Sequence, residues 1–251
     1  MERRFEGKSV VVTGAAAGIG RAYALGFARE AAAVALLDVD AAGLKETAEE
    51  IARCGASATP IELDITDETA VARGIAAAAE SLGGIDVLIN NAGLHLGDFN
   101  ETTRLDVERW RRLLDVNVIG QLLCAKHCHP QMKARGGGAI VNQSSMSAYM
   151  GVGAYSVSKL ALNGLTVSLA RELAPDGIRV NGIAPGLVAS GAAMAGLDAA
   201  TKDAVLASQL VKRVGRTDDA VSMVKFLCSE EASFITGQTF LVDGGAVARP
   251  G

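Results

Sequence analysis

Long apolar runs, blocks of like charge and paired cysteines are all missing from this sequence, and each absence excludes a class of protein. No stretch approaches the roughly 20 apolar residues that a membrane-spanning helix needs. The charged opening from Met1 to Arg4 has no secretory signal pattern. A net charge of −4 without a basic stripe argues against nucleic acid or an anionic membrane as a partner. We therefore expect a cytoplasmic protein that binds neither.

Four cysteines are present, and none forms a C-x-x-C pair. Cys124 and Cys128, with His127 and His129 close by, raise the question of a metal site. On a helix, however, the two cysteines would share a face while both histidines point elsewhere. Free cysteine is commonly a small buried hydrophobe, so we expect no bound metal.

The chain is rich in hydrophobic residues, which make up 49% of its 251 positions and are enough for a sizeable core. Strand and helix patterns alternate without a break in composition, as is typical of an α/β fold. We expect a single domain over residues 1–251, with a Rossmann-like doubly wound parallel sheet and helices on both of its faces. The expected strands include 8–14, 34–38, 58–63, 85–90 and 239–242, and the expected helices include 41–54, 68–82, 107–135 and 154–173.

A glycine cluster connects the first strand to a helix that reaches about Glu30. Gly14, Gly18 and Gly20, with Ile19 between the last two, have the spacing G-x-x-x-G-x-G. Glycine suits a tight turn where the backbone approaches a pyrophosphate closely and helix amides face its charge. The position between strand and helix predicts a dinucleotide-binding loop.

An acidic residue, Asp38, ends the second strand 18 residues after Gly20. A carboxylate there can accept both hydroxyls of an adenosine ribose and would repel a 2′-phosphate. Neither Ala17 nor Val39 provides the cation expected near a 2′-phosphate. Asp38 therefore indicates NAD rather than NADP. The alternative is that it only caps the helix that begins at Ala41.

Tyr155 and Lys159 lie four residues apart in an expected helix, so they share one face. A free phenol has a pKa of about 10, which a neighbouring cation lowers. Ser145, ten residues before Tyr155, could hydrogen-bond the oxygen of an alcohol or a carbonyl. The three together suggest a proton-transfer site, although a Tyr-x-x-x-Lys pair alone also occurs by chance in helices.

Six motifs in this order resemble those of the short-chain dehydrogenase/reductase family, and the resemblance covers essentially the whole chain. They are Thr13-Gly14-x-x-x-Gly18-Ile19-Gly20, Asn90-Asn91-Ala92-Gly93, Asn117, Ser145, Tyr155-x-x-x-Lys159 and Pro185-Gly186. The resemblance implies that Tyr155 is the catalytic base or acid. It also implies that Lys159 binds the nicotinamide ribose and lowers the pKa of the tyrosine. In the same way, Ser145 would polarise the substrate oxygen and Asn117 would hold a water in a proton relay.

The resemblance carries further cofactor contacts to this chain, one position at a time. Asp64 and Ile65 match a pair that brackets adenine, and residues 91–93 match a segment along the adenosine ribose. Val188 matches a residue whose backbone meets the carboxamide, and Ser190 replaces the usual threonine while keeping its hydroxyl. Each position could also be an ordinary strand end or turn. The predicted cofactor contacts are Gly14, Gly18, Ile19, Gly20, Asp38, Asp64, Ile65, Asn91, Ala92, Gly93, Tyr155, Lys159, Pro185, Gly186, Val188 and Ser190.

The chain departs from the family pattern at the catalytic serine and at one helix end. The family commonly places the serine 13 residues before the tyrosine, where this chain has Asn142. We interpret Ser145 as the equivalent after a shortened connection, because it follows the strand end as the family's serine does. Ser144 and Ser147 remain alternatives. The segment Ala31-Ala32-Ala33 stands where the family usually has a glycine at a helix end, so a left-handed cap there would cost about 1 kcal/mol unless another turn avoids it.

The second half of the chain is expected to shape the substrate pocket. Residues 187–210, which are rich in alanine and glycine, suggest a mobile lid. No arginine or lysine clearly faces the pocket, and His95 could line it but is better explained as a loop histidine. The resemblance also implies that helix 107–135 and the helix of Tyr155 form a subunit interface, so we expect a homotetramer. The predicted substrate contacts are Ser145, Met146, Tyr149, Met150, Leu187 and Met194.

These features favour an NAD-dependent oxidoreductase that interconverts a secondary alcohol and a ketone, with an apolar cyclic or aryl small molecule as substrate. One alternative is a 3-oxoacyl-thioester reductase, which predicts NADPH and a basic patch for a carrier protein. Another is an NAD(H)-sensing protein without catalysis, which would be expected to lack Tyr155 or Lys159. The sequence shows no such patch and retains both residues.

Overall fold

The core of the structure is one seven-stranded sheet in which every neighbouring pair of strands is parallel. The computed structural model describes residues 3–95, 97, 99–189 and 199–247. The strand order is β3-β2-β1-β4-β5-β6-β7, so the chain winds outward from β1 in one direction and from β4 in the other. The expected doubly wound α/β fold is confirmed.

The elements match the expected ones, with small differences at their ends. The strands are β1 (Ser9–Thr13), β2 (Ala33–Asp38), β3 (Ala58–Glu62), β4 (Val87–Asn90), β5 (Gly138–Gln143), β6 (Ile178–Pro185) and β7 (Thr239–Val242). The α-helices are α1 (Gly18–Ala28), α2 (Ala41–Arg53), α3 (Glu68–Leu82), α4 (Val107–Leu114), α5 (Gln121–Ala134), α6 (Gly153–Leu173), α8 (Ala199–Ser208) and α9 (Thr217–Cys228). Shorter segments include η2 (Asp115–Gly120), η3 (Met146–Tyr149), η4 (Ala174–Asp176) and η5 (Glu230–Ala232).

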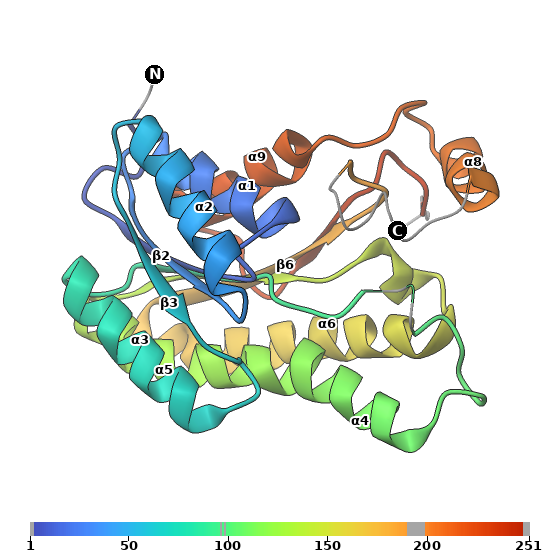
Figure 1. Ribbon diagram of the computed structural model, residues 1–251, viewed down its shortest axis with the longest axis horizontal. Helices are drawn as coiled ribbons and strands as arrows, with labels where there is room; N and C mark the ends of the chain where they lie inside the picture. The colour runs from blue at the N-terminus through green and yellow to red at the C-terminus, as the bar shows by residue number, and fades with distance from the viewer. Residues whose placement is uncertain (1–2, 96, 98, 190–198, 248–251) are drawn as a thin grey trace.

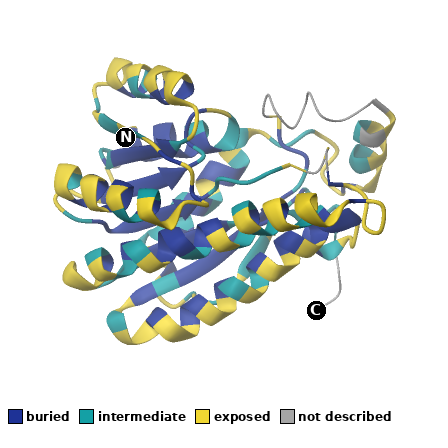
Figure 2. Ribbon diagram, turned by 60° about the horizontal axis from the view of Figure 1, so that its bottom comes forward, coloured by how far each residue is buried: buried dark blue, intermediate teal, exposed yellow. Residues whose placement is uncertain are grey.

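Helices cover both faces of the sheet, with α1, α2 and α9 on one side and α3, α5 and α6 on the other (Figure 1). Successive side chains of a strand point to opposite faces. Val10 and Val12 of β1 therefore pack in the cluster that includes α1 and α9, whereas Val11 packs in the cluster that includes α3, α5 and α6. The strands lie buried between helices whose outer faces are exposed (Figure 2). Within the described ranges, no helix is long and apolar enough to span a bilayer.

The carboxyl ends of β1 and β4 lie side by side where the direction of winding reverses. The chain leaves β1 toward α1 on one face and leaves β4 toward α4 on the other (Figure 1). In open parallel sheets, a crevice at such a reversal is the usual place for a ligand. The fold thus directs attention to the glycine loop after β1 and the Asn-Asn-Ala-Gly segment after β4.

The expected long helix at 107–135 is present as α4, η2 and α5 in unbroken succession. The middle segment, η2, is a π-helix and contains the fully buried Asn117. A π-helical turn inside a longer helix is frequently found at a functional site. Here it accompanies a hydrogen bond of 2.7 Å from the backbone N–H of Leu94, in the loop after β4, to Oδ1 of Asn117.

The turn after α1 adopts the left-handed conformation despite its alanine. Ala31 has a φ of 67° and is the non-glycine residue with a positive φ among the described residues. The N–H of Ala32 donates to the carbonyl of Phe27 at 3.2 Å and so closes the end of the helix. Of the two expectations for this position, the strained left-handed cap, at a cost of about 1 kcal/mol, is the one found.

Candidate active site

A cavity of about 430 Å³ lies along the carboxyl ends of the central strands, a size within the usual range of small-molecule sites. It brings together the glycine loop, the end of β2, the segment after β4 and the start of α6. Of the predicted cofactor contacts, the lining includes Gly14, Gly18, Ile19, Gly20, Asp38, Asp64, Ile65, Asn91, Ala92, Gly93, Tyr155, Lys159, Pro185 and Gly186. Residues far apart in the sequence therefore meet around one cavity.

The glycine loop follows a path that side chains would block. Gly14 has a φ of 66°, and a Cβ there would lie 2.9 Å from the Cα of Ala92. A Cβ on Gly20 would lie 1.9 Å from the carbonyl oxygen of Gly14. The helix α1 begins at Gly18, and the N-cap residue Ala17 provides no side-chain cap, so the first amides of the helix are open to an anion. This loop fits the pyrophosphate of a dinucleotide.

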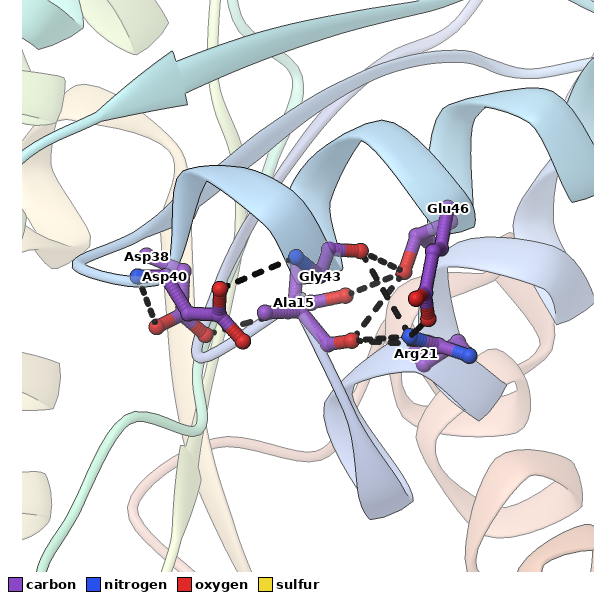
Figure 3. A network of polar contacts seen from close by, with 8 residues as sticks. Ala15, Arg21, Asp38, Asp40, Gly43 and Glu46 are labelled. Atoms are coloured by element: carbon purple, nitrogen blue, oxygen red, sulfur yellow. Dashed lines mark hydrogen bonds and ion pairs between the residues drawn. The ribbon is translucent and has the colours of Figure 1, made fainter.

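Asp38 ends β2, and backbone hydrogen bonds fix its carboxylate at the cavity (Figure 3). Its Oδ2 accepts from the N–H of Ala16 at 3.0 Å, and its Oδ1 accepts from the N–H of Asp40 at 3.1 Å. The cap of α2 is Asp40, whose side chain accepts from the N–H of Gly43 at 3.0 Å. The alternative that Asp38 merely caps this helix is therefore wrong.

The side chain of Arg21 is bound by residues next to the glycine loop. Its Nη2 forms an ion pair with Oε2 of Glu46 at 3.0 Å and also donates to the carbonyl of Ala16 (Figure 3). Ala17 of the glycine loop and Val39, which follows Asp38, both line the cavity and carry no charge. The arrangement fits ribose hydroxyls at Asp38 better than a 2′-phosphate.

Tyr155 and Lys159 lie one turn apart on α6, on the shared face that their spacing predicts. The Nζ of Lys159 is 5.7 Å from the centroid of the Tyr155 ring. The same Nζ donates to the carbonyl oxygen of Gln143 at 2.8 Å. The ammonium group is thus anchored at the end of β5, beside the phenol.

Burial perturbs both of these side chains. It raises the pKa of the Tyr155 phenol to about 12, against the smaller opposing effect of a hydrogen bond with the Ser145 side chain. It lowers the pKa of Lys159 to about 8. The expected lowering of the tyrosine pKa is therefore not found in this chain, because desolvation outweighs the favourable contacts. Two titratable groups with perturbed pKa values in one cavity are typical of a functional site.

Ser145 lies in the connection from β5 to α6, ten residues before Tyr155 in the sequence. The connection contains η3 and Gly151, which has a φ of 70°, and it leads into Gly153, the first residue of α6, which has a φ of 68°. A Cβ on Gly153 would lie 2.4 Å from the carbonyl carbon of Asn100, so this turn requires glycine. The shortened connection is thus a tight, ordered turn that lets the Ser145 side chain hydrogen-bond to Tyr155.

The neighbouring candidates for the serine position have other contacts. Ser144 also lines the cavity, but it is buried and its hydroxyl donates to a backbone carbonyl of α6 at 3.3 Å. Ser147 is buried and does not line the cavity. Asn142, which stands at the usual spacing, is fully buried and donates to Oγ1 of Thr166 at 2.9 Å. These contacts support Ser145 as the serine that faces a substrate.

Asn117 lies beneath the cavity and does not belong to its lining. Besides its bond to Leu94, its Nδ2 donates to Oγ of Ser158 at 3.1 Å. A Cβ placed on Gly93 would lie 3.1 Å from Oδ1 of Asn117 and 3.4 Å from Nζ of Lys159. The amide and the ammonium therefore approach the same point of the loop after β4, although no direct hydrogen bond joins them among the described contacts.

Asp64 and Asn91 line the cavity and also stabilise the loops that form it. The Oδ1 of Asp64 accepts from the N–H of Thr66 at 2.9 Å, which is a local turn. The Nδ2 of Asn91 donates to the carbonyl of Thr13 at 2.9 Å and so ties the end of β4 to the glycine loop. Both the functional and the structural interpretation of these residues thus have support.

Several predicted contacts lie elsewhere. The lining does not include Asn117, Met146, Tyr149, Met150, Leu187 or Val188. Leu187 and Val188 are buried, and the carbonyl of Leu187 accepts from the N–H of Gly215 at 2.9 Å. Ser190 and Met194, with most of the front half of the predicted lid, lie outside the described residues.

Three polar residues of the lining were not expected there: Gln143, Arg112 and His95. Gln143 is the last residue of β5, so its place at a strand end was the available signal. The expectation that no further arginine or lysine clearly faces the pocket is wrong for Arg112 of α4, which contributes to the lining. His95 lines the cavity as well as belonging to a loop, and desolvation followed by the charge of Lys159 lowers its pKa.

Comparison with known proteins extends this description to the whole chain. A family model described as enoyl-(acyl carrier protein) reductase matches residues 14–247. A cis-4-hydroxycyclohexanecarboxylate dehydrogenase from Sinomonas cyclohexanicum is 39% identical over 99% of this chain and 100% of that protein. A sorbitol dehydrogenase from Cereibacter sphaeroides is 39% identical over 96% of this chain and 98% of that one.

Solved structures agree with these relatives. A 7α-hydroxysteroid dehydrogenase complexed with NADH and 7-oxoglycochenodeoxycholic acid superposes with a TM-score of 0.93 at 32% identity, covering 99% of this chain and 97% of that one. Fold, cavity and relatives together define an oxidoreductase of the class that uses nicotinamide cofactors. The chain belongs to the short-chain dehydrogenase/reductase family, as its motifs predict.

Proposed function

We propose that this protein is an NAD-dependent dehydrogenase that interconverts a cyclic secondary alcohol and the corresponding ketone. The observation that carries the proposal is the arrangement of Ser145, Tyr155 and Lys159 at one part of a cavity that also contains the glycine loop and Asp38. The hydroxyls of Ser145 and Tyr155, beside the buried ammonium of Lys159, suit proton exchange with an alcohol. The rest of the cavity suits a dinucleotide.

Different lining residues would bind different parts of the cofactor. When bound, the nicotinamide dinucleotide supplies the hydride acceptor or donor. The glycine loop and the first amides of α1 would bind its pyrophosphate, and Asp38 would accept hydrogen bonds from the adenosine ribose. Asp64 and Ile65 would border the adenine, and Lys159 would bind the ribose of the nicotinamide.

Tyr155 would exchange the proton of the substrate hydroxyl, which Ser145 would orient. Lys159 and Asn117, which approach the same point beside Gly93, would pass that proton to solvent through water. Because burial raises the pKa of Tyr155, the phenol is the prevailing form at neutral pH and is ready to donate to a ketone oxygen. Alcohol oxidation needs the phenolate, so its rate is expected to rise with pH, while ketone reduction declines.

The substrate class rests on the lining and on the relatives. Ile19, Leu94 and Val116 give the cavity an apolar side. The relatives named for cis-4-hydroxycyclohexanecarboxylate and for a 7α-hydroxysteroid are named for alcohols on a ring. Arg112 and His95 add polar groups to the same lining. A substrate panel should therefore pair cyclic alcohols that carry a carboxylate with uncharged analogues of the same size.

A second candidate is the reduction of an acyl thioester, which the description of the matched family model favours. It predicts oxidation of NADPH with acetoacetyl-coenzyme A or crotonyl-coenzyme A and little activity on simple cyclic alcohols. The carboxylate at Asp38 argues against NADPH, because it would repel the 2′-phosphate. The panel above, extended with these two thioesters and run with both cofactors, separates the two candidates.

We also propose that the active protein is a homotetramer. Val157, Leu160 and Val167 are exposed apolar residues along one side of α6, and Ile119 of η2 is exposed as well. An exposed apolar face of this kind marks a protein interface. Size-exclusion chromatography with light scattering measures the mass directly, and a monomer at micromolar concentration would refute this assembly.

The Tyr155→Phe variant tests the proposed chemistry. It removes one hydroxyl and keeps the ring, so NADH binding should stay at the wild-type level. Turnover should fall by about 100-fold to 10,000-fold, the usual contribution of a positioned acid or base. Steady-state kinetics and NADH fluorescence titrations on the same preparation provide both values. Unchanged turnover would remove Tyr155 from the mechanism, and wild-type protein that binds NADH but converts no substrate would favour a sensor.

A further inference from the structure

A polar pair, Tyr23 and Gln143, lies inside a layer that is otherwise apolar. Gln143 ends β5 and pairs in register with Ile183 of β6. Val141, two residues earlier on the same strand face, and Ile183 belong to the apolar cluster that packs against α1 and α9. Tyr23 of α1 is fully buried in that cluster, and its hydroxyl donates to Oε1 of Gln143 at 2.7 Å. A tyrosine and an amide thus pair where neighbouring positions carry only hydrocarbon.

The hydrogen bond leaves the amide nitrogen of Gln143 free for another partner. Burial raises the pKa of Tyr23 well above its ordinary value, so its hydroxyl stays a donor at any working pH and occupies the amide oxygen. The amide nitrogen has two N–H donors. Within the described part of the chain, Nε2 donates to no acceptor, and Gln143 lines the cavity. A ligand that fills the cavity would leave this donor unsatisfied unless it offers an acceptor there.

The position of Gln143 identifies which half of a dinucleotide it meets. Its carbonyl oxygen accepts from Nζ of Lys159 at 2.8 Å, so it lies beside the proposed catalytic groups. Asp38, the proposed adenosine site, ends β2, which is separated from β5 by β1 and β4. At a strand spacing of about 4.8 Å, the two ends are roughly 14 Å apart. Gln143 therefore belongs to the nicotinamide end of the cavity.

We propose that the side-chain amide of Gln143, held in place by Tyr23, donates a hydrogen bond to the nicotinamide end of the bound dinucleotide and so contributes to cofactor affinity. This inference rests on the proposed function, in which the cavity binds NAD(H). Gln143 is the binding residue, and Tyr23 is a positioning residue that acts through it.

Binding measurements without substrate test the proposal. NADH is titrated by its own fluorescence, and ADP-ribose, which has both riboses and both phosphates but no nicotinamide, is measured by competition. The variants are Gln143→Met, Tyr23→Phe and the double variant, which restores an apolar pair and so protects the fold. Gln238→Met is the matched control, because Gln238 is exposed and does not line the cavity.

The proposal predicts that Gln143→Met and the double variant weaken NADH about fivefold to tenfold, the loss of one hydrogen bond, and leave ADP-ribose binding unchanged. Tyr23→Phe should weaken NADH binding in the wild-type background and should have no further effect on it in the Gln143→Met background. A double variant that binds NADH as tightly as wild type, or an equal loss for ADP-ribose, would overturn the proposal. Wild-type protein that binds no dinucleotide would instead refute the proposed function and this inference with it.

Discussion

The proposed preference for NAD⁺ rests on a single carboxylate, so Asp38→Asn is the most informative substitution. The change removes the negative charge and keeps the shape, and the amide oxygen of asparagine can still accept from the N–H of Ala16, which Asp38 binds at 3.0 Å. We expect catalysis with NAD⁺ to weaken and catalysis with NADP⁺ to improve. The preference for NAD⁺ over NADP⁺ should therefore narrow.

The size of the effect follows from two contributions. A hydrogen bond from a ribose hydroxyl to a carboxylate is worth about 1.5–3 kcal/mol, and asparagine keeps part of it, so kcat/KM for NAD⁺ should fall roughly tenfold. Repulsion between a carboxylate and a phosphate 5 Å away is about 3 kcal/mol at an effective dielectric constant of 20, before discounting for solvent. Removing that repulsion should raise kcat/KM for NADP⁺ by at least about tenfold. The ratio of the two values should then drop roughly 100-fold.

Asp40→Asn provides the matched control for this experiment. It removes the same charge two residues away, it does not line the cavity, and asparagine remains a good cap for α2. The assay is kcat/KM for each cofactor with one alcohol at fixed ionic strength. If Asp38→Asn leaves the cofactor ratio unchanged, or Asp40→Asn shifts it equally, the ratio does not depend on contact with Asp38.

Two further predictions concern stability. Because burial lowers the pKa of Lys159 to about 8 from 10.5, the folded state carries the cost of a buried ammonium below pH 8 and loses it as the pH rises toward 10.5. Lys159→Met should therefore be more stable than wild type at pH 7 by up to about 3 kcal/mol, and this difference in unfolding free energy should shrink by pH 10. Urea unfolding at both pH values measures the difference. A difference that does not change with pH would contradict the lowered pKa of Lys159. Ala31→Gly should stabilise the protein by about 1 kcal/mol, because it relieves the left-handed strain at a φ of 67°. Ala77→Gly, at an exposed position in the middle of α3, should destabilise the protein by a similar amount. Thermal unfolding that shows both variants destabilised would refute the strain.

The sequence was sufficient for the parts of the site that depend on backbone geometry and strand order. Gly14 and Gly20 are required by close backbone approaches, and such positions leave a spacing that can be recognised. Asp38 ends a strand whose place in the sheet follows from the alternation of strands and helices. The carboxyl ends of parallel strands meet at one edge, so these residues had to share a cavity.

What could not be predicted depends on distances between side chains. The partner of Gln143 is Tyr23, 120 residues away, and no local pattern joins an amide at a strand end to a tyrosine in a helix. The raised pKa of Tyr155 was missed because a neighbouring cation is visible in the sequence and the degree of burial is not. Burial proved the larger of the two effects.

The residues near the substrate were also only partly predictable from the sequence. Met150 was expected in the pocket from its place in the connection before α6, but the turn through Gly151 and Gly153 leaves it exposed and outside the lining. Arg112 was not expected in the lining. The sequence does not show which face of a long helix points toward the cavity when a π-helical segment interrupts the helix.

The most direct test of the account is the reduction of NAD⁺ by purified protein with a panel of cyclic secondary alcohols, followed by NADH absorbance and run in parallel with NADP⁺. The account predicts turnover with NAD⁺, a strong preference over NADP⁺ and loss of that turnover in the Tyr155→Phe variant. Turnover with NADP⁺ alone, or no turnover of any alcohol with either cofactor, would contradict it.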